Sequence, residues 1–261
     1  WHYRSRHHSL ISLSNREFYD NRLVVFPSPE PPGRALGLTF HHLPDARYDR
    51  GRSRTNPLEA KVVAQAVMTH AKTTPHLTLG VAAFSIQQAD AIKDQLELMR
   101  RADPSAEAFF SAHPHEPFFV KNLESVQGDE RDVIFISVGY GRSEEGYLSM
   151  NFGALNAQGG ERRLNVLITR ARRRCEVFSN LTHEDIDLTR TSARGVAVLK
   201  AFLKYAQTGI DDVPTSGTEE GDSPFEDEVA KALRSQGHDV VAQVGSGGFR
   251  IDLAVRDPER P

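Results

Sequence analysis

The stretch "RRLNVLITRARRR", residues 162–174, places an apolar stripe and six arginines within thirteen residues. Its apolar side chains recur with the i, i+3, i+4, i+7 spacing of one helix face. They are Leu164, Leu167, Ile168 and Ala171. The pattern predicts a helix over about 161–172, and "RCEVFSN", residues 174–180, predicts a strand directly after it. A helix that leads into a strand is the repeating unit of a parallel α/β sheet.

Similar units surround this stretch in the sequence. Further strands are predicted over 35–43, 77–84, 117–125 and 132–141, and further helices over 55–67, 87–100 and 194–207. One helix has a well-marked start, because Asn56 can act as the N-cap, Pro57 suits the first turn and Glu59 completes a capping-box pattern. Strands that alternate with helices predict a parallel sheet covered on both faces.

Composition limits the classes of protein that this chain can belong to. With 261 residues, 39% of them apolar, it is long enough for one large α/β domain and a smaller unit. The net charge is −3, but residues 211–261 hold 12 acidic and 5 basic residues, so residues 1–210 are mildly basic. This permits local binding of a polyanion. A single cysteine, Cys175, excludes an internal disulfide and a cysteine-based zinc cluster, and fits a reducing compartment.

No stretch approaches the roughly 20 apolar residues that span a bilayer, and the first residues lack the apolar run of a signal peptide. We therefore expect a cytoplasmic protein with no membrane partner. Because the sequence begins at Trp1 and stops at Pro261 directly after a strand-like stretch, we also expect it to be a fragment.

Two arginines of the opening stretch are candidates for binding an anion. Arg163 and Arg170 lie seven residues apart, so a helix would project both in similar directions, close to its buried stripe. An arginine held near a core face is costly unless it has an anionic partner, and its forked guanidinium matches the geometry of phosphate. Residues 172–174, three arginines in a row, fit a solvated cationic edge.

A second candidate segment is "NLESVQGDERDVIFISV", residues 122–138. A polar turn containing Gln127, Gly128 and Glu130 precedes an apolar strand. Glycine permits a close approach of the backbone to a ligand, and the Glu130 carboxylate could accept hydrogen bonds from ribose hydroxyls. An ordinary turn that needs glycine for its geometry is the alternative. At the start of the chain, Tyr3 and Arg4 could stack on a base and reach a phosphate.

Together these segments resemble superfamily 1 helicases, in the branch that includes the nonsense-mediated-decay helicase. "HYRS" followed by "LISLSNREFY", then "AAFSIQQADAI", "NLESVQGDERDVIFIS" and "RRLNVLITRARRR" match, in order, four blocks of that family's second RecA-like domain. The sequence departs from the pattern at Ser85, where an aromatic residue is common, and at Asn122 and Glu124, which replace threonine and aspartate.

The resemblance implies a role for each matching residue. The nucleotide would be bound by Tyr3, Arg4, Gln127, Gly128, Glu130, Arg163 and Arg170, and nucleic acid by Ser85, Gln88, Asn122 and Arg172. Tyr3 would stack on adenine and Glu130 would hold the ribose. Arg4 and Arg170 would be the catalytic arginines at the γ-phosphate, and Gln127 would couple the nucleotide to nucleic acid. Asn165 matches the motif with a less defined role.

The sequence contains no G-x-x-x-x-G-K-[ST] motif and no strand that ends in paired acids. By resemblance, a first RecA-like domain upstream would supply these Walker motifs, and with them the grip on Mg²⁺ and the β-phosphate. We therefore expect residues 1–261 alone to be inactive as an ATPase.

The end of the sequence carries a second resemblance. Residues 208–223 read as an acidic flexible linker, and residues 224–261 predict an amphipathic helix and a hairpin. This region resembles the start of a restriction-endonuclease-like domain related to very-short-patch repair nucleases, as in large bacterial helicase-like proteins. Glu226 and Asp252 would then be part of an incomplete divalent-metal site.

The sequence thus predicts a second RecA-like motor domain over 1–207, the linker over 208–223, and a truncated nuclease-like α/β unit over 224–261. The expected activity is ATP-driven translocation on nucleic acid, with DNA as the expected partner. Two alternatives remain open at this stage: a Mg²⁺-dependent DNA endonuclease whose helicase-like part delivers substrate, and a nucleic-acid-binding module without catalysis.

Overall fold

The computed structural model describes residues 5–25, 28, 36–209, 223–246 and 249–255. Its body is a five-stranded sheet in the order β1-β5-β4-β2-β3, in which every neighbouring pair is parallel. The strands are β1 (Gly37–His42), β2 (Leu79–Ala83), β3 (Phe119–Asn122), β4 (Arg131–Ser137) and β5 (Ala171–Ser179). The predicted parallel α/β sheet is confirmed. Tyr3 and Arg4 lie outside the described residues.

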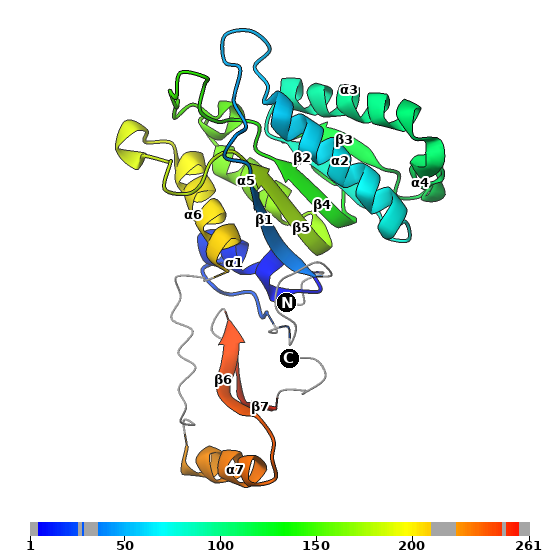
Figure 1. The fold of residues 1–261 in the computed structure, drawn as a ribbon. Helices are drawn as coiled ribbons and strands as arrows, with labels where there is room; N and C mark the ends of the chain where they lie inside the picture. The colour runs from blue at the N-terminus through cyan, green and yellow to red at the C-terminus, as the bar shows by residue number, and fades with distance from the viewer. Residues whose placement is uncertain (1–4, 26–27, 29–35, 210–222, 247–248, 256–261) are drawn as a thin grey trace.

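Helices cover both faces of this sheet (Figure 1). One face carries α2 (Pro57–Thr73), α3 (Ile86–Ala102) and α4 (Glu107–Ala112), and the other carries α1 (Ser12–Tyr19), α5 (Gly160–Ile168) and α6 (Arg194–Thr208). The two faces follow from the period of two along each strand. In β4, Val133 and Phe135 are buried in the cluster beneath α2, α3 and α4, while Ile134 and Ile136 are buried in the cluster beneath α1, α5 and α6.

The helix predicted over 161–172 is shorter in the structure. Helix α5 ends at Ile168, and β5 begins only three residues later at Ala171. The Thr169 hydroxyl bonds back to the carbonyl oxygens of Asn165 and Val166 at 2.9 and 3.0 Å, which caps the last turn. From Ala171 onward the backbone forms hydrogen bonds with β4 instead of continuing the helix. The three arginines of 172–174 therefore lie on a strand.

The start of α2 confirms half of the predicted capping box. The Asn56 side chain accepts a hydrogen bond from the Glu59 amide at 3.2 Å, with Pro57 in the first turn. The reciprocal half is wrong, because the Glu59 carboxylate does not return to the Asn56 amide. That amide donates to Gln88 Oε1 at 2.8 Å, and Glu59 Oε1 instead accepts from Ser137 and Gly139.

After α6, the next described element is α7 (Pro224–Ser235), followed by the antiparallel pair β6 (Val240–Ser246) and β7 (Phe249–Val255). The predicted helix and hairpin are confirmed, and Figure 1 shows them next to each other. This unit has a small core of its own, in which Ala230, Val240 and Ala242 are buried. Residues 210–222, most of the predicted linker, lie outside the described residues.

Candidate functional site

Two of the candidate nucleotide residues, Glu130 and Arg170, lie at the amino edge of the sheet. In a parallel sheet the amino ends of all strands meet at one edge. Glu130 directly precedes β4 and Arg170 directly precedes β5. The Arg131 amide donates to the Arg170 carbonyl oxygen at 3.2 Å, so the two candidates lie on adjacent segments. Both are half-buried.

Arg170 is held by the end of α5. Its Nε donates to the Val166 carbonyl oxygen at 2.7 Å, and its Nη2 donates to Thr169 Oγ1 at 3.1 Å. Among the described residues, no carboxylate forms an ion pair with it. A guanidinium has five donors, so this arginine is fixed in place with donors left for an anion. Its direction is set by the turn after α5, and not by a shared helix face with Arg163 as the sequence predicted.

The loop between β3 and β4 is anchored at two points and open at its tip. Leu123 and Val126 are buried in the core, whereas Gln127 and Gly128 are exposed. Gly128 adopts a φ of 89°, and a Cβ built on it would meet nothing within 4 Å. The glycine therefore serves the left-handed turn, and it leaves the backbone at the tip accessible.

Arg163 connects this loop to α5. Its Nε lies 3.7 Å from Glu124 Oε1, and its Nη1 donates to the Gln158 carbonyl oxygen at 3.4 Å. Both charged side chains are exposed enough for solvent to weaken the pair. Arg163 thus links the two candidate segments, and it is less firmly held than Arg170.

Arg172 departs from its predicted role as a solvated contact to nucleic acid. Its guanidinium forms a forked pair with both Glu116 oxygens, each at 2.5 Å, and an ion pair with Asp132 at 3.3 Å. Arg174 is also paired, with Glu176 at 2.9 Å, and its side chain is mostly buried. Placement on β5 explains both differences, because it brings Arg172 next to Glu116 and Asp132 and puts Arg174 two residues from Glu176 on the same strand.

The carboxyl edge of the sheet carries the residues predicted to contact nucleic acid. Ser85 caps α3, since its hydroxyl oxygen accepts from the Gln88 amide at 3.2 Å. Gln88 is 0% exposed, and its side chain bonds both backbone groups of Asn56 and the Ser137 hydroxyl. The prediction that Gln88 contacts nucleic acid is therefore wrong for this structure, because no polar atom of its side chain is left open.

Asn122, at the end of β3, is half-buried, and its side-chain oxygen accepts from the Ser125 amide at 3.0 Å. This local turn leaves its predicted contact with nucleic acid untested. Asn122 and Ser85 nonetheless follow neighbouring strands, β3 and β2, at the same edge.

The sequence did not reveal the buried cluster next to Gln88. Glu59 is 0% exposed, and its Oε1 accepts from the Ser137 hydroxyl at 2.6 Å and from the Gly139 amide at 2.7 Å. Burial raises the pKa of the Glu59 carboxyl to about 7, although these hydrogen bonds act against the rise. Glu59 stands at the third position of a capping-box pattern, which gave no sign of burial.

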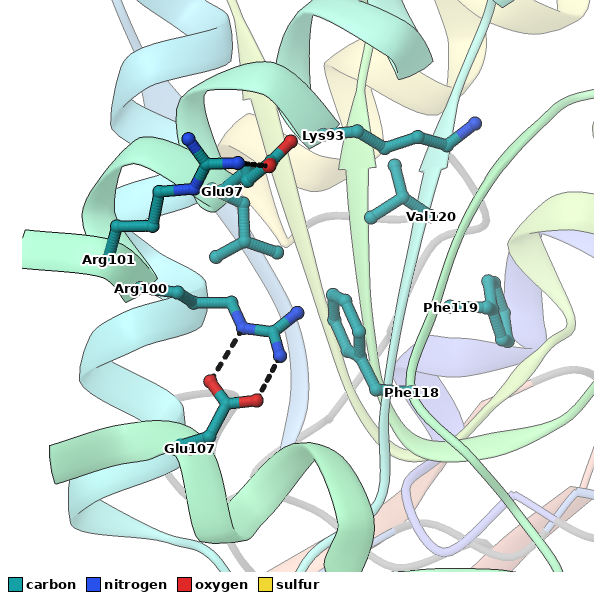
Figure 2. A pocket seen from close by; sticks show the side chains of 9 residues that line it. Lys93, Glu97, Arg100, Arg101, Glu107, Phe118, Phe119 and Val120 are labelled. Carbon is teal, nitrogen blue, oxygen red and sulfur yellow. Dashed lines mark hydrogen bonds and ion pairs between the residues drawn. The ribbon is translucent and has the colours of Figure 1, made fainter. Parts of the chain in front are cut away.

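A groove between α3 and the edge strand β3 contains none of the predicted site residues (Figure 2). Phe118 and Val120 form an apolar wall, opposite the charged face of α3. The cations that line it are already paired: Arg100 with Glu107, Arg101 with Glu97, and Lys93 with Asp90 outside the groove. It therefore offers no excess positive charge to a phosphate.

The predicted metal residues of the C-terminal unit have other roles or partners here. Ser223 Oγ donates to Glu226 Oε1 at 3.0 Å and accepts from the Glu226 amide at 3.3 Å. Ser223 is thus the N-cap of α7. Asp252 is exposed on β7. Across the described part of the chain, no group of three or more His, Cys, Asp or Glu side chains could hold a metal ion. The incomplete two-carboxylate site predicted from Glu226 and Asp252 is smaller than such a group, so it stays a prediction.

None of the described helices is long and apolar enough to cross a bilayer.

Comparison with known proteins places the chain in a family. A family profile described as "AAA domain" matches residues 1–182, which is more than half of the chain, so the protein belongs to that family. An uncharacterized ATP-dependent helicase of Mycoplasma genitalium is 35% identical over 210 residues, and its homologue in Mycoplasma pneumoniae is 32% identical over 210 residues. Each alignment covers 79% of this chain and 18% of the relative, so the chain matches less than a fifth of those proteins.

A solved structure described as the C-terminal domain of a possible DNA helicase from Lactobacillus plantarum is also similar. It shares 12% sequence identity with this chain, at a TM-score of 0.37, and the match covers 69% of this chain and 88% of that one.

Proposed function

We propose that residues 1–207 form the second motor domain of an ATP-dependent superfamily 1 helicase. The observation that carries the proposal is the placement of Arg170 and Glu130 on adjacent segments at one edge of a parallel sheet, with no carboxylate among the described residues neutralising Arg170. Membership of the AAA family and the two helicase relatives support it.

In this proposal the nucleotide lies against the amino edge of the sheet. Arg170 contacts the γ-phosphate and Glu130 accepts hydrogen bonds from the ribose, while the exposed tip at Gln127 and Gly128 faces the phosphates. Tyr3 and Arg4 would contribute adenine and γ-phosphate contacts. A cation aimed at the transferred phosphoryl group stabilises charge in the transition state, and it is worth roughly 10³–10⁵ in rate in related NTPases.

The rest of the ATP site must come from another domain. The sequence has no Walker motifs, and the described residues hold no metal cluster. We infer that a Walker-bearing first RecA-like domain of the same protein binds Mg²⁺ and the β-phosphate. Nucleic acid, with DNA as the expected form, would run along the carboxyl edge near Ser85 and Asn122. A cytoplasmic location is part of the same proposal.

No described contact favours the endonuclease alternative. Glu226 accepts a hydrogen bond from Ser223, the N-cap of α7, and Asp252 lies exposed on β7. A nuclease-like role for residues 224–261 remains a proposal from sequence resemblance alone.

The test is the substitution Arg170→Ala in the intact protein, with ATP turnover and nucleotide binding measured separately. We expect turnover to fall by about 10³-fold or more while nucleotide affinity is largely kept. Arg162→Ala is the matched control, because Arg162 lies in the same motif with a side chain that is 86% exposed. Near-normal turnover in the Arg170 variant would contradict the assignment.

A further inference from the structure

The start of β5 contains an irregularity at Arg172. Arg131 on β4 is opposite Ala171 on β5, but Val133 is opposite Arg174. One residue of β4, Asp132, therefore faces two residues of β5, Arg172 and Arg173. This is a β-bulge, a feature that is rare between parallel strands and that often re-aims side chains next to active sites.

The Arg172 side chain holds the bulge in place from three directions. The Glu116 carboxylate, just before β3, accepts hydrogen bonds from two guanidinium nitrogens at 2.5 Å each. Asp132 on β4 lies at 3.3 Å, and Thr78 Oγ1, just before β2, accepts from Nη2 at 3.3 Å. A single side chain thus connects the amino ends of β2, β3, β4 and β5. The hydrogen bond with Glu116 raises the pKa of Arg172 and lowers the pKa of the Glu116 carboxyl.

The backbone of Arg172 adds a fourth connection. Its carbonyl oxygen accepts from the Arg6 amide at 2.7 Å, which places the N-terminal segment beside β5. Arg6 follows the candidate Arg4 by two residues, Asp132 follows Glu130 by two, and Arg172 follows Arg170 by two. Arg6, Asp132 and Arg172 itself are therefore each two residues from a candidate nucleotide residue.

We propose that Arg172 is a positioning residue for the nucleotide: its side chain locks the bulge of β5, and the bulge sets where Arg170 lies relative to Glu130. The proposal rests on the nucleotide site proposed above. It replaces the reading of Arg172 as a surface cation for nucleic acid, since its charge is already taken up by Glu116 and Asp132.

The planar guanidinium group explains why arginine, and not lysine, suits this position. A guanidinium can donate to both Glu116 oxygens and still reach Asp132 and Thr78. A lysine ammonium is a point charge on a flexible stem, so it can pair with one carboxylate at a time. Lysine would keep the charge balance of the edge and lose the geometry that locks the bulge.

The first experiment measures local order in the chain of 261 residues. Amide hydrogen exchange is followed at Arg6 and Arg131, whose amides bond to the carbonyl oxygens of Arg172 and Arg170, with the Val63 amide in α2 as a reference. We expect Arg172→Met to speed exchange at Arg6 and Arg131 by about tenfold or more relative to Val63, which corresponds to a local loss of about 1.4 kcal/mol. Unchanged exchange at both amides would overturn the proposal, whether or not the protein hydrolyses ATP.

The second experiment measures steady-state ATP turnover in the intact protein for Arg172→Met, Arg172→Lys and the exposed control Arg162→Met. Rates are normalised to the folded fraction of each variant. We expect both Arg172 variants to lose about 10- to 100-fold in kcat, since a misplacement of about 1 Å can cost that much. The KM for ATP should change little, because the γ-phosphate contact strengthens in the transition state. The control should match the wild type.

The lysine variant separates positioning from simple charge balance. We expect it to melt near the wild-type temperature while keeping the low kcat. Wild-type kcat in Arg172→Lys would overturn the positioning role, because charge alone would then suffice. If the unsubstituted intact protein shows no ATP turnover, the proposed function fails, whereas the exchange experiment still decides whether Arg172 orders the edge.

Discussion

Glu59 and Arg172 are charged residues that the fold places inside the protein in different ways. Arg172 is surrounded by carboxylates, so it keeps its charge. Among the described residues, no cation forms an ion pair with Glu59; its Oε1 accepts two hydrogen bonds, while Oε2 is buried and has no hydrogen-bond partner. An ionised carboxylate in such a place is costly, which is why burial raises the pKa of Glu59 to about 7.

This raised pKa predicts a specific pH dependence of stability. Between about pH 4.5 and pH 7 the folded protein keeps a proton on Glu59 that the unfolded chain has released. The free energy of unfolding therefore decreases as pH rises through this window, by on the order of 3 kcal/mol in total. Glu59→Gln should remove that decrease, because the amide cannot ionise. Chemical denaturation of both proteins at pH 5 and pH 8 measures it.

The comparison with Glu59→Gln is needed because buried histidines act in the opposite direction. Burial lowers the pKa of His8 to about 4, with His7 as a second cause, and burial also lowers the pKa of His70. Neutral buried histidines lose stability as pH falls below about 6.5. Their effect is common to both proteins and cancels in the difference. Equal pH profiles for wild type and variant would show that Glu59 does not carry the proton.

At the scale of single residues, the sequence predicted which side chains lie near a buried face, but it did not predict which residues they form ion pairs with. The prediction that Arg170 sits close to a buried face agrees with its half-buried position, because the apolar stripe of α5 was visible in the sequence. Arg172 was predicted to be solvated because its partners Glu116 and Asp132 are 56 and 40 residues away along the chain. Spacing within a motif carries no information about such distant contacts.

At the scale of elements, the boundary between α5 and β5 shows a similar limit. The apolar period that predicts a helix continues to Ala171, which is buried in the strand instead. A buried alanine satisfies both patterns, so the period alone cannot place the boundary. The parallel sheet and most helices were predictable, because their apolar runs and the start signal at Asn56 are local.

The packing of α5 on α6 depends on two glycines that the sequence did not single out. A Cβ on Gly195, in the first turn of α6, would collide with the Leu155 carbonyl oxygen, and a Cβ on Gly160 would meet the same backbone. Backbone atoms cannot move away as a flexible side chain can. We expect Gly195→Ala to lower the free energy of unfolding by about 1–3 kcal/mol, the usual range for overpacking, measured by urea denaturation.

Gly51→Ala is the control for this prediction. A Cβ at Gly51 would meet nothing within 4 Å, and its backbone lies outside the left-handed region. We expect its free energy of unfolding to stay within about 0.5 kcal/mol of the wild type. A Gly195→Ala protein as stable as this control would mean that α5 and α6 can separate without cost.

At the scale of the whole molecule, the body and the C-terminal unit differ in what holds them together. The two large buried clusters draw on residues between Leu10 and Ala206. In the unit of α7, β6 and β7, the side chains whose burial is described include the buried Ala230, Val240 and Ala242 and a 74% exposed Phe225.

This difference predicts that the body folds without the C-terminal unit. Helix α6 has its own end signal, because Gly209 adopts a φ of 66° and its amide donates to the Tyr205 carbonyl oxygen at 2.9 Å. A chain that stops after Gly209 should therefore keep the thermal midpoint of the body, within about 2 °C of the longer chain. Amide exchange across β4 and β5 should also be unchanged. A clearly lower midpoint, or faster exchange in those strands, would show that residues after Gly209 stabilise the sheet and that the predicted division at residue 207 is wrong.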